Sequence, residues 1–299
     1  MKTVHFHVGA GRCGSSLIQA LFNDVNMHEV FTRFSLKYDP EIYLALTELT
    51  PIETFNEADW RDFRDQHIVP LKDQAFHHYF ITQENLFGID GDNGGLDACR
   101  ASSAAIDYLM EGFRTRIVIL VRRQDTYIES IYSQHVKRRE VRDFATYLDE
   151  LPWENLDWGE VADIHADRFG RENVTVLPFE KRVLNLANID WFVTAVLRAI
   201  GVTQIIEFEN LPTVNPSVSP RAMEVQRLAN KLLTEDESLH LANWFEANIP
   251  KSPEESYSLM SEEQRADVLD FFRERNRRLC SEYMPDYDPA YYLGEDAKG

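Results

Sequence analysis

The fold is decided by the stretch His7-Val-Gly-Ala-Gly-Arg-Cys-Gly-Ser-Ser-Leu17, close to the start of the chain. Apolar residues alternate with other residues over 4–8, which predicts a short β-strand before it. Apolar residues at helical spacing over 17–22 predict a helix after it. A glycine-rich turn between a strand and a helix points several backbone N–H groups, together with the positive end of the helix dipole, at one place. The stretch therefore predicts a site for a phosphate-like anion, with a plain connecting turn as the alternative.

The spacing of this stretch can be compared with that of the nucleotide-binding P-loop, G-x-x-x-x-G-K-[ST]. Gly9 and Gly14 stand at the two glycine positions, and Ser16 stands at the hydroxyl position. Ser15 replaces the lysine that normally reaches the β- and γ-phosphates, which argues against an ordinary ATPase or kinase. The nearest cation is Arg12, inside the turn itself.

The composition is that of an ordinary globular protein. Of 299 residues, 44% are hydrophobic and 27% are charged, enough to bury a sizeable core. The longest apolar run in the middle of the chain, 117–121, is far too short to cross a bilayer, and the chain enters its first strand without an apolar leader. We therefore expect a cytoplasmic protein with no membrane partner.

The net charge and the cysteines exclude further classes of site. A net charge of −19 disfavours nucleic acid as a partner, because phosphate contacts need a basic surface. Cys13, Cys99 and Cys280 are too widely spaced for a disulfide framework or a zinc site, and we predict no metal. Cys13 could act as a nucleophile near a helix N-terminus, but we prefer to interpret it as a small residue that fills the turn.

Strands alternating with helices predict an α/β protein with a P-loop-like, open parallel β-sheet flanked by helices. Further strands are expected at 79–82, 116–122 and 173–177, and helices at 98–113 and 189–200. Beyond Asn215 the strand signals end, so the C-terminal part is predicted to be mainly helical, with helices from Ser219-Pro220 and from Ser261.

We expect a single domain over residues 1–299. Its α/β core covers 1–214, and within it 30–75 is predicted to be an insertion on the acceptor side of the site, with plain connecting structure as the alternative. Residues 215–285 form the helical C-terminal segment, and 286–299 are predicted to be a loosely held tail.

A second anion site is indicated by the basic segment 112–142, which holds eight Lys or Arg against three Asp or Glu in an acidic protein. The strand 117–121 feeds directly into Arg122, Arg123 and a helix that carries Ser130. Because ligands bind beyond the carboxyl ends of parallel strands, this site and the glycine-rich turn should lie at one edge of the sheet.

With these two sites the sequence resembles the sulfotransferases that use 3′-phosphoadenosine-5′-phosphosulfate (PAPS). Residues 11–17 are similar to the family's first motif, a strand–loop–helix with Lys or Arg before Ser-Gly-Thr-Thr or Ser-Gly-Ser-Ser. Arg122 with Ser130 eight residues later is similar to the second motif, and 176–180 resemble the third. Residues 215–220 look like a segment of bacterial members, without an assigned role. The matches span roughly 3–202.

The resemblance implies PAPS as co-substrate, its desulfated form PAP as product, and no metal. The 5′-phosphosulfate would be held by the first motif, that is by Gly11, Arg12, Cys13, Gly14, Ser15 and Ser16. Arg122 and Ser130 would hold the 3′-phosphate, while Arg123 could share this role or be surface charge. The second motif departs from the usual pattern, because Arg123-Gln-Asp stands where Asn-Pro-Arg-Asp is common. No residue matches the adenine-stacking Trp of cytosolic animal enzymes.

Catalysis would then use Arg12, as a charge stabiliser, and Glu84, as the base that accepts the proton of a hydroxyl or amine. Glu84 could instead cap the next helix or pair with an arginine. His77 and His78 are the next candidates for the base. His5 and His7 look like a metal pair, although a buried strand explains their spacing as well.

The resemblance thus implies an enzyme that moves the sulfuryl group of PAPS to a small-molecule or carbohydrate acceptor by in-line displacement. A P-loop nucleotide kinase or NTPase, and a non-catalytic nucleotide-binding protein of the same fold, are the alternatives. Neither the acceptor nor the oligomeric state follows from the sequence.

Overall fold

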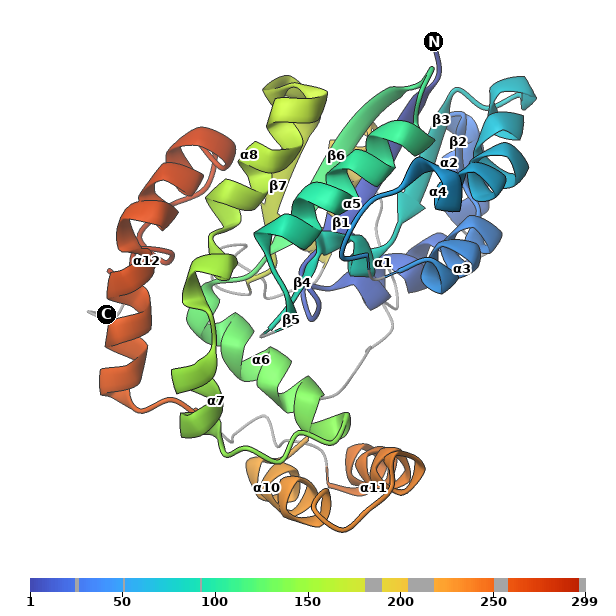
Figure 1. Ribbon diagram of the computed structural model, residues 1–299. Coiled ribbons are helices and arrows are strands. Elements are labelled where there is room, and N and C mark those ends of the chain that lie inside the picture. Colours follow the sequence, from blue (N-terminus) through green and yellow to red (C-terminus); the bar gives the residue numbers. More distant parts are fainter. Residues whose placement is uncertain are drawn as a thin grey trace.

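Five parallel strands form one sheet in the computed structural model, which describes residues 1–24, 27–50, 52–91, 93–180, 190–203, 218–249 and 258–295 (Figure 1). The strand order is β2-β3-β1-β6-β7, so the predicted α/β fold with an open parallel sheet is confirmed. The strands are β1 (Thr3–Gly9), β2 (Leu36–Tyr38), β3 (His78–Thr82), β6 (Arg114–Val121) and β7 (Val174–Pro178).

The two central strands are β1 and β6, and both are deeply buried. Val4, Phe6 and Val8 are fully inaccessible, as is nearly all of the apolar run 117–121. Strands covered on both faces need such continuous apolar sequences. The register places Gly9 opposite Leu120, so the segments that follow β1 and β6 leave the sheet at the same edge.

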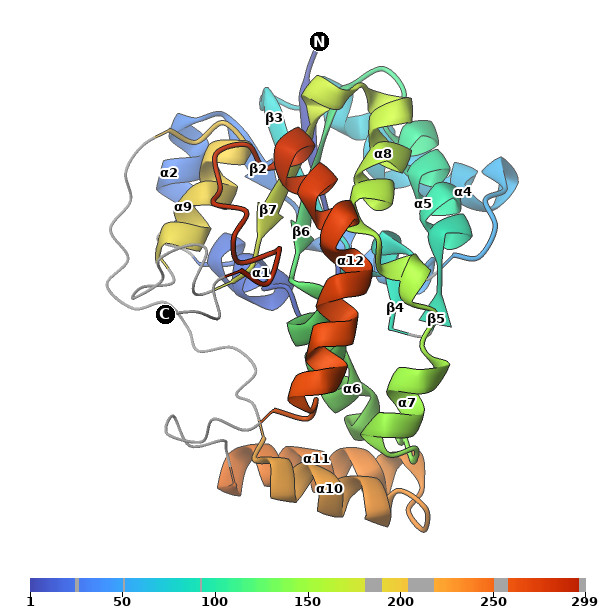
Figure 2. The same ribbon diagram turned by 90° about the vertical axis from the view of Figure 1, so that its left-hand side faces the viewer.

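Helices cover both faces of the sheet (Figure 2). Helices α5 and α8 lie on one face, while α1, α2 and α9 lie on the other. No helix in the described part of the chain is long and apolar enough to span a bilayer. The helices run α1 Ser15–Phe22, α2 Met27–Arg33, α3 Pro40–Glu48, α4 Glu57–Phe63, α5 Leu96–Leu109, α6 Gln124–Lys137, α7 Phe144–Glu150, α8 Trp158–Phe169, α9 Asp190–Ala199, α10 Pro220–Ala229, α11 Glu235–Asn248 and α12 Glu262–Tyr283.

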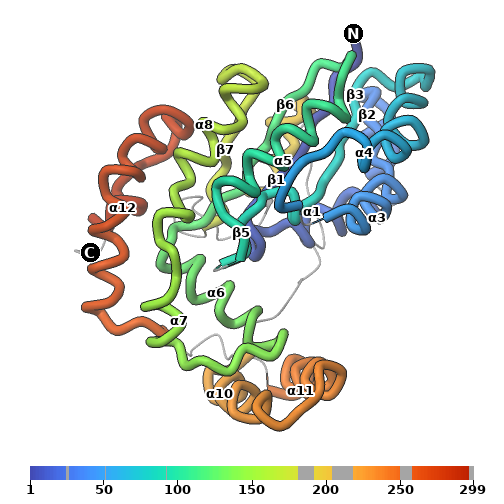
Figure 3. The backbone as a smooth tube through the Cα atoms, in the orientation of Figure 1, coloured from blue at the N-terminus to red at the C-terminus, as the bar shows by residue number. Residues whose placement is uncertain are grey.

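The helices beyond the carboxyl edge of the sheet are α6, α7, α10 and α11 (Figure 3). Helix α10 begins where the Ser-Pro pair predicts, because the Ser219 hydroxyl accepts from the N–H of Ala222. Ser261 and Gln264 form a capping box at the start of α12. Helix α11 was not predicted from the sequence. Residues 215–217, in the segment that looks like one of bacterial members, lie outside the described residues.

The region between α1 and β3 holds more regular structure than the irregular sequence indicates. Helix α4 continues into a π-turn at Arg64–Ile68 and a 3₁₀ turn at Val69–Asp73. The edge strand β2 was missed because it has only three residues, too few to show an alternating pattern.

Residues 286–295 differ from the predicted loose tail. Tyr292 is 1% exposed and Leu293 is also buried. The Tyr291 hydroxyl donates to Glu180 at 3.0 Å, and its ring lies under the Arg123 guanidinium. Two consecutive tyrosines after an acidic, proline-containing stretch gave no periodic signal, so their burial could not be read from the sequence.

The helix predicted from Ser261 is α12, and its apolar face packs on the core through Val268, Phe272 and Leu279, which are all fully buried. Replacing Phe272 by Ala should therefore lower the free energy of unfolding by about 3–5 kcal/mol, because it removes a buried ring and leaves a cavity. Urea denaturation measures the change. The neighbouring Phe271 is 37% exposed, and Phe271→Ala should cost much less. Equal losses in the two variants would show that α12 does not pack on the core as described.

Candidate functional site

The turn after β1 is built around two residues with left-handed backbone conformations, Arg12 (φ 67°) and Gly14 (φ 90°). Gly14 is the N-cap of α1 and brings no side chain to cap the helix. The first N–H groups of a helix have no partners within it. The turn therefore presents backbone donors and the positive end of the α1 dipole to the carboxyl edge of the sheet.

Cys13 fills the interior of this turn. It is fully buried, and its N–H donates to the carbonyl of Ala10 at 3.2 Å. Burial strongly raises the pKa of the Cys13 thiol, which keeps it protonated. The structure favours the space-filling role over the nucleophile.

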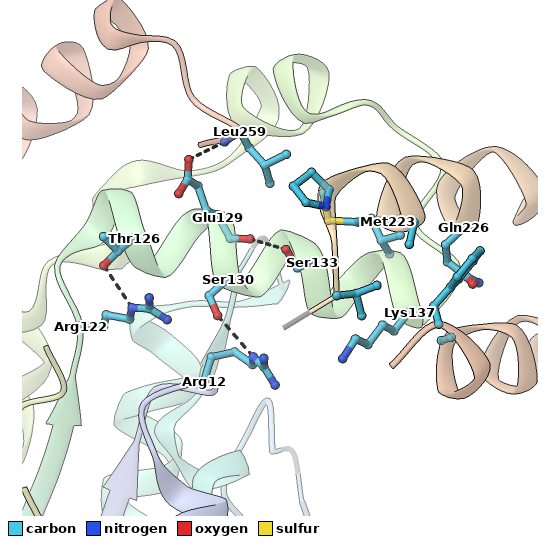
Figure 4. A pocket seen from close by; sticks show the side chains of 16 residues that line it. Arg12, Arg122, Thr126, Glu129, Ser130, Ser133, Lys137, Met223, Gln226 and Leu259 are labelled. Carbon is cyan, nitrogen blue, oxygen red and sulfur yellow. Dashed lines mark hydrogen bonds between the residues drawn. The ribbon is translucent and has the colours of Figure 1, made fainter. Parts of the chain in front are cut away.

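Arg12 extends from the turn to α6, where its Nε donates to the Ser130 hydroxyl at 3.3 Å (Figure 4). This hydrogen bond joins the two predicted anion sites. Among the described residues, no carboxylate lies within ion-pair distance of Arg12. Burial, and then repulsion by Arg122, lower the pKa of Arg12. The Glu84 carboxylate partly opposes this lowering from a greater distance, so a bound anion could still supply the direct ion pair that the guanidinium lacks.

Arg122 is held at the end of β6 by three neighbours. Its Nε donates to the Thr126 hydroxyl at 3.1 Å and lies 3.8 Å from the Glu180 carboxylate, while its carbonyl accepts from the Trp158 indole at 2.7 Å. Thr126, one turn into α6, was not singled out in the sequence. It could have been predicted, because a hydroxyl four residues after the arginine that ends a strand lies close to it once the following helix forms.

Glu180, in the third motif, fixes the start of α6 through hydrogen bonds. Its carboxylate accepts from the N–H of Arg123 at 2.7 Å and from the Thr126 hydroxyl at 2.9 Å. Burial raises the pKa of Glu180, against the effect of Arg122 and these hydrogen bonds. Arg123 itself neither reaches the cavity nor lies on the surface, because it is buried against Asp125 and Tyr291.

Glu84 lies at the same edge of the sheet, directly after β3. The cap of the following 3₁₀ turn is the Gln83 side chain, so Glu84 is not the cap. Burial raises the pKa of Glu84, and Asp90 adds to this, while Ser15, Arg138 and Arg12 oppose it. Glu84 is therefore close enough to Arg12 for their charges to interact.

The histidine alternatives lie elsewhere. His78 pairs with Thr3 in the parallel register, which places His77 and His78 at the amino ends of the strands, opposite to the glycine-rich turn. His5 faces His78 at 3.2 Å, and His7 binds the Thr82 hydroxyl at 2.8 Å. Across the described ranges, no three His, Cys, Asp or Glu side chains come together as metal ligands.

A cavity of about 160 Å³ opens between α6 and the α10–α11 pair (Figure 4). Arg12, Arg122 and Ser130 line it together, which brings three predicted residues to one space. Gly11 and Gly14 lie in the adjacent turn, Ser15 and Ser16 are the first two residues of α1, and Glu84 does not line the cavity. The other wall residues on α6 were not predicted from the sequence. They could have been found because their spacing places them on the same face of the helix as Ser130. They are Thr126, Glu129, Ser133, Val136 and Lys137.

The fold of this chain is similar to that of a solved structure. No protein-family model matches the chain, and no curated protein matches it. Among solved structures, the crystal structure of a sulfotransferase from Alicyclobacillus acidocaldarius superposes with a TM-score of 0.51 at 14% sequence identity, covering 98% of this chain and 99% of that one. The chain has a sulfotransferase-like fold. At this identity the likeness concerns the fold, and it extends from end to end of both chains.

Gly14 offers a direct test of the turn. A Cβ on Gly14 would lie 2.8 Å from the Phe179 ring and would force a side chain into a left-handed backbone conformation. We expect Gly14→Ala to lower the free energy of unfolding by at least about 1–2 kcal/mol in urea denaturation. Gly11→Ala is the control, because a Cβ there meets nothing closer than 3.7 Å. A Gly14→Ala variant as stable as the Gly11→Ala variant would contradict the described turn.

Proposed function

We propose that this chain is a PAPS-dependent sulfotransferase, which moves a sulfuryl group to a hydroxyl or amine of a small acceptor. One observation carries the proposal. Arg12 and Arg122 come from two different strand–turn–helix units and line one cavity, and among the described residues no carboxylate lies within ion-pair distance of Arg12. Two cations at separate points suit a ligand that is anionic at two points.

The residues fit the two anionic ends of PAPS in different ways. The turn, with the N-terminus of α1 and the Arg12 guanidinium, suits the 5′-phosphosulfate. Arg122 and Ser130 offer donors for the 3′-phosphate at the start of α6, while Thr126 positions Arg122. The Arg12–Ser130 hydrogen bond supports the assignment of the two groups to one ligand.

In the proposed reaction, bound PAPS supplies an activated bond between sulfur and the bridging oxygen of its 5′-phosphate. The acceptor oxygen or nitrogen forms a bond to sulfur while that bridging bond breaks, and PAP leaves with the bond's electron pair. Arg12 stabilises the negative charge that grows on the bridging oxygen. Glu84 takes the acceptor's proton, and its raised pKa brings it closer to the strength that a general base needs.

A P-loop kinase or NTPase remains the principal alternative. Ser15 stands where such enzymes carry a lysine, and the cavity lining offers cations in place of a magnesium-holding carboxylate pair. Calorimetry separates the two functions: PAP should bind saturably in the absence of metal, while ATP with Mg²⁺ should bind more weakly. Tighter binding of ATP with Mg²⁺ would overturn the proposal in favour of a kinase or NTPase.

The two arginines should differ in what they contribute. Arg12→Ala should lower kcat by about 10²–10³-fold, the cost of losing one preorganised donor in the transition state. Arg122→Ala should mainly raise the Kd for PAP, by roughly 10–100-fold, because it removes hydrogen bonds from a charged group. Transfer from labelled PAPS and calorimetry with PAP measure the two effects. Arg100→Ala, a surface arginine paired with Glu160, is the control for net charge. Unchanged turnover in Arg12→Ala would remove Arg12 from the mechanism.

Glu84 makes the pH dependence testable. A base works when it is deprotonated, so kcat/KM should rise with pH through the pKa of Glu84. Because burial raises that pKa, the midpoint of the acidic limb should lie above the ordinary glutamate range. Glu84→Gln should lower activity and abolish this limb in a pH profile from 4 to 9. Full activity with an unchanged profile would place the base elsewhere, provided that the variant still binds PAP.

A further inference from the structure

The half of the cavity that lies away from the two arginines has apolar walls. It is bounded by α6 on one side and by α10 and α11 on the other, and Figure 4 shows Met223 and Leu259 at this end. The apolar lining residues are Val218, Pro220, Ala222, Met223, Ala242, Phe245 and Leu259.

Most polar groups on these walls already have partners within the protein, although the buried Gln226 Oε1 has no hydrogen-bond partner among the described residues. The Ser133 hydroxyl donates to the carbonyl of Glu129, and the Lys137 ammonium pairs with Glu246 on α11. The Gln226 amide nitrogen donates to Asn230 at 2.8 Å and to the Ser238 hydroxyl at 2.9 Å. A ligand that enters this half would therefore find few donors to satisfy its own polar groups.

Glu129 is occupied in the same way, although it lines the cavity. Its carboxylate accepts from the N–H groups of Leu259 and Met260 at 2.8 and 2.9 Å and pairs with Arg265. It holds the segment before α12 against α6. Its charge is thus balanced by structural partners and is not an open site for a cation.

A nucleotide bound as proposed would occupy the opposite end. Its two anionic groups would meet the turn and the start of α6, near Arg12, Arg122 and Ser130. Lys137 is seven residues beyond Ser130, which places it about 10 Å further along the helix at 1.5 Å per residue. Burial, and then repulsion by Arg12, lower the pKa of Lys137 to about 8, so its ammonium extends back toward the arginine end and the apolar half is the part of the cavity that α10 and α11 line.

We propose that this apolar half binds the acceptor, and that the acceptor is an alcohol or amine with an apolar body. This inference rests on the proposed function. The reacting hydroxyl or amine points to the Arg12 end, and the body packs against Met223, Ala242 and Phe245. An apolar cavity of about 150 Å³ holds a benzene molecule. The whole cavity, with its arginine end, measures about 160 Å³, so its apolar half suits a body no larger than about one six-membered ring.

The same walls exclude carbohydrate acceptors. A sugar would carry several hydroxyls into the apolar half, where the walls offer too few free polar groups to replace their hydrogen bonds to water. The free-energy cost of burying hydroxyls without hydrogen-bond partners therefore discriminates against a sugar. An apolar body gains from the transfer instead, because its surface leaves water.

Two acceptors of matched shape test this inference on the full-length protein. Cyclohexanol and myo-inositol share a six-membered carbocycle but differ in the number of hydroxyls. With labelled PAPS, cyclohexanol should be sulfated with at least tenfold higher kcat/KM than myo-inositol. Equal or better use of myo-inositol would overturn the inference. So would PAP binding with transfer to neither compound.

Substitutions on α11 locate the acceptor. Ala242→Phe places a ring in the cavity and should lower kcat/KM for cyclohexanol at least tenfold while the Kd for PAP changes less than twofold. Ala247→Phe is the matched control, because Ala247 lies on the exposed side of the same helix and does not line the cavity. If Ala242→Phe fails to fold, Met223→Ala gives the opposite test: it enlarges the cavity and should raise kcat/KM for 2-naphthol relative to cyclohexanol at least fivefold.

The outcomes separate this inference from the function on which it rests. A large loss of PAP affinity in Ala242→Phe, with none in Ala247→Phe, would mean that the nucleoside occupies the apolar half. That result overturns the acceptor site and leaves the proposed function standing. An unchanged preference in Met223→Ala would also overturn it. If the unaltered protein binds no PAP at all, the proposed function itself fails.

Discussion

Two guanidinium groups of like charge, on Arg12 and Arg122, are held at one edge of the sheet because β1 and β6 are neighbours within it. Their repulsion contributes to the lowered pKa of Arg12. The Glu180 carboxylate, 3.8 Å from Arg122, offsets only part of this charge. Like charges at close range in a partly buried site repel each other and destabilise the free protein. A ligand that carries two negative groups would relieve this repulsion, and the relief would favour its binding. The surrounding packing keeps the two cations in place while no such ligand is bound.

That packing depends on parts of the chain that are distant in sequence. Glu180 follows β7 and binds the N–H of Arg123 and the Thr126 hydroxyl, so it fixes the start of α6. The Tyr291 hydroxyl donates to the same carboxylate, and Tyr291 covers Arg123. Each of these three donors favours the charged form of the buried carboxylate. Tyr291 is therefore coupled to Arg122 and the start of α6, although it does not line the cavity.

The sequence allowed the central part of this arrangement to be predicted and hid the rest, for physical reasons. The buried strands carry continuous apolar runs, and the glycine-rich turn requires residues such as Gly14 that accept a left-handed backbone, so both leave local signals. The site roles given to Arg12, Arg122, Ser130 and Glu84 remain predictions, although the structure places them at one edge. The apolar wall on α10 and α11 could not be found, because its members are scattered and only the tertiary packing brings them together. The burial of Tyr292 has the same origin.

Because the turn carries an arginine, charge stabilisation and proton transfer would fall to different residues in the proposed reaction. A guanidinium stays protonated even when its pKa is lowered, so Arg12 can stabilise negative charge but cannot supply a proton to the leaving group. PAP must then leave as an anion, which a phosphate does readily, and the only proton to be moved is that of the acceptor. Glu84 is suited to that single transfer, because burial raises its pKa while Arg12 and Ser15 limit the rise. Burial at this edge thus lowers the pKa of Arg12, which still stays charged, and raises the pKa of Glu84, which makes it a stronger base, so one desolvated environment sets both properties.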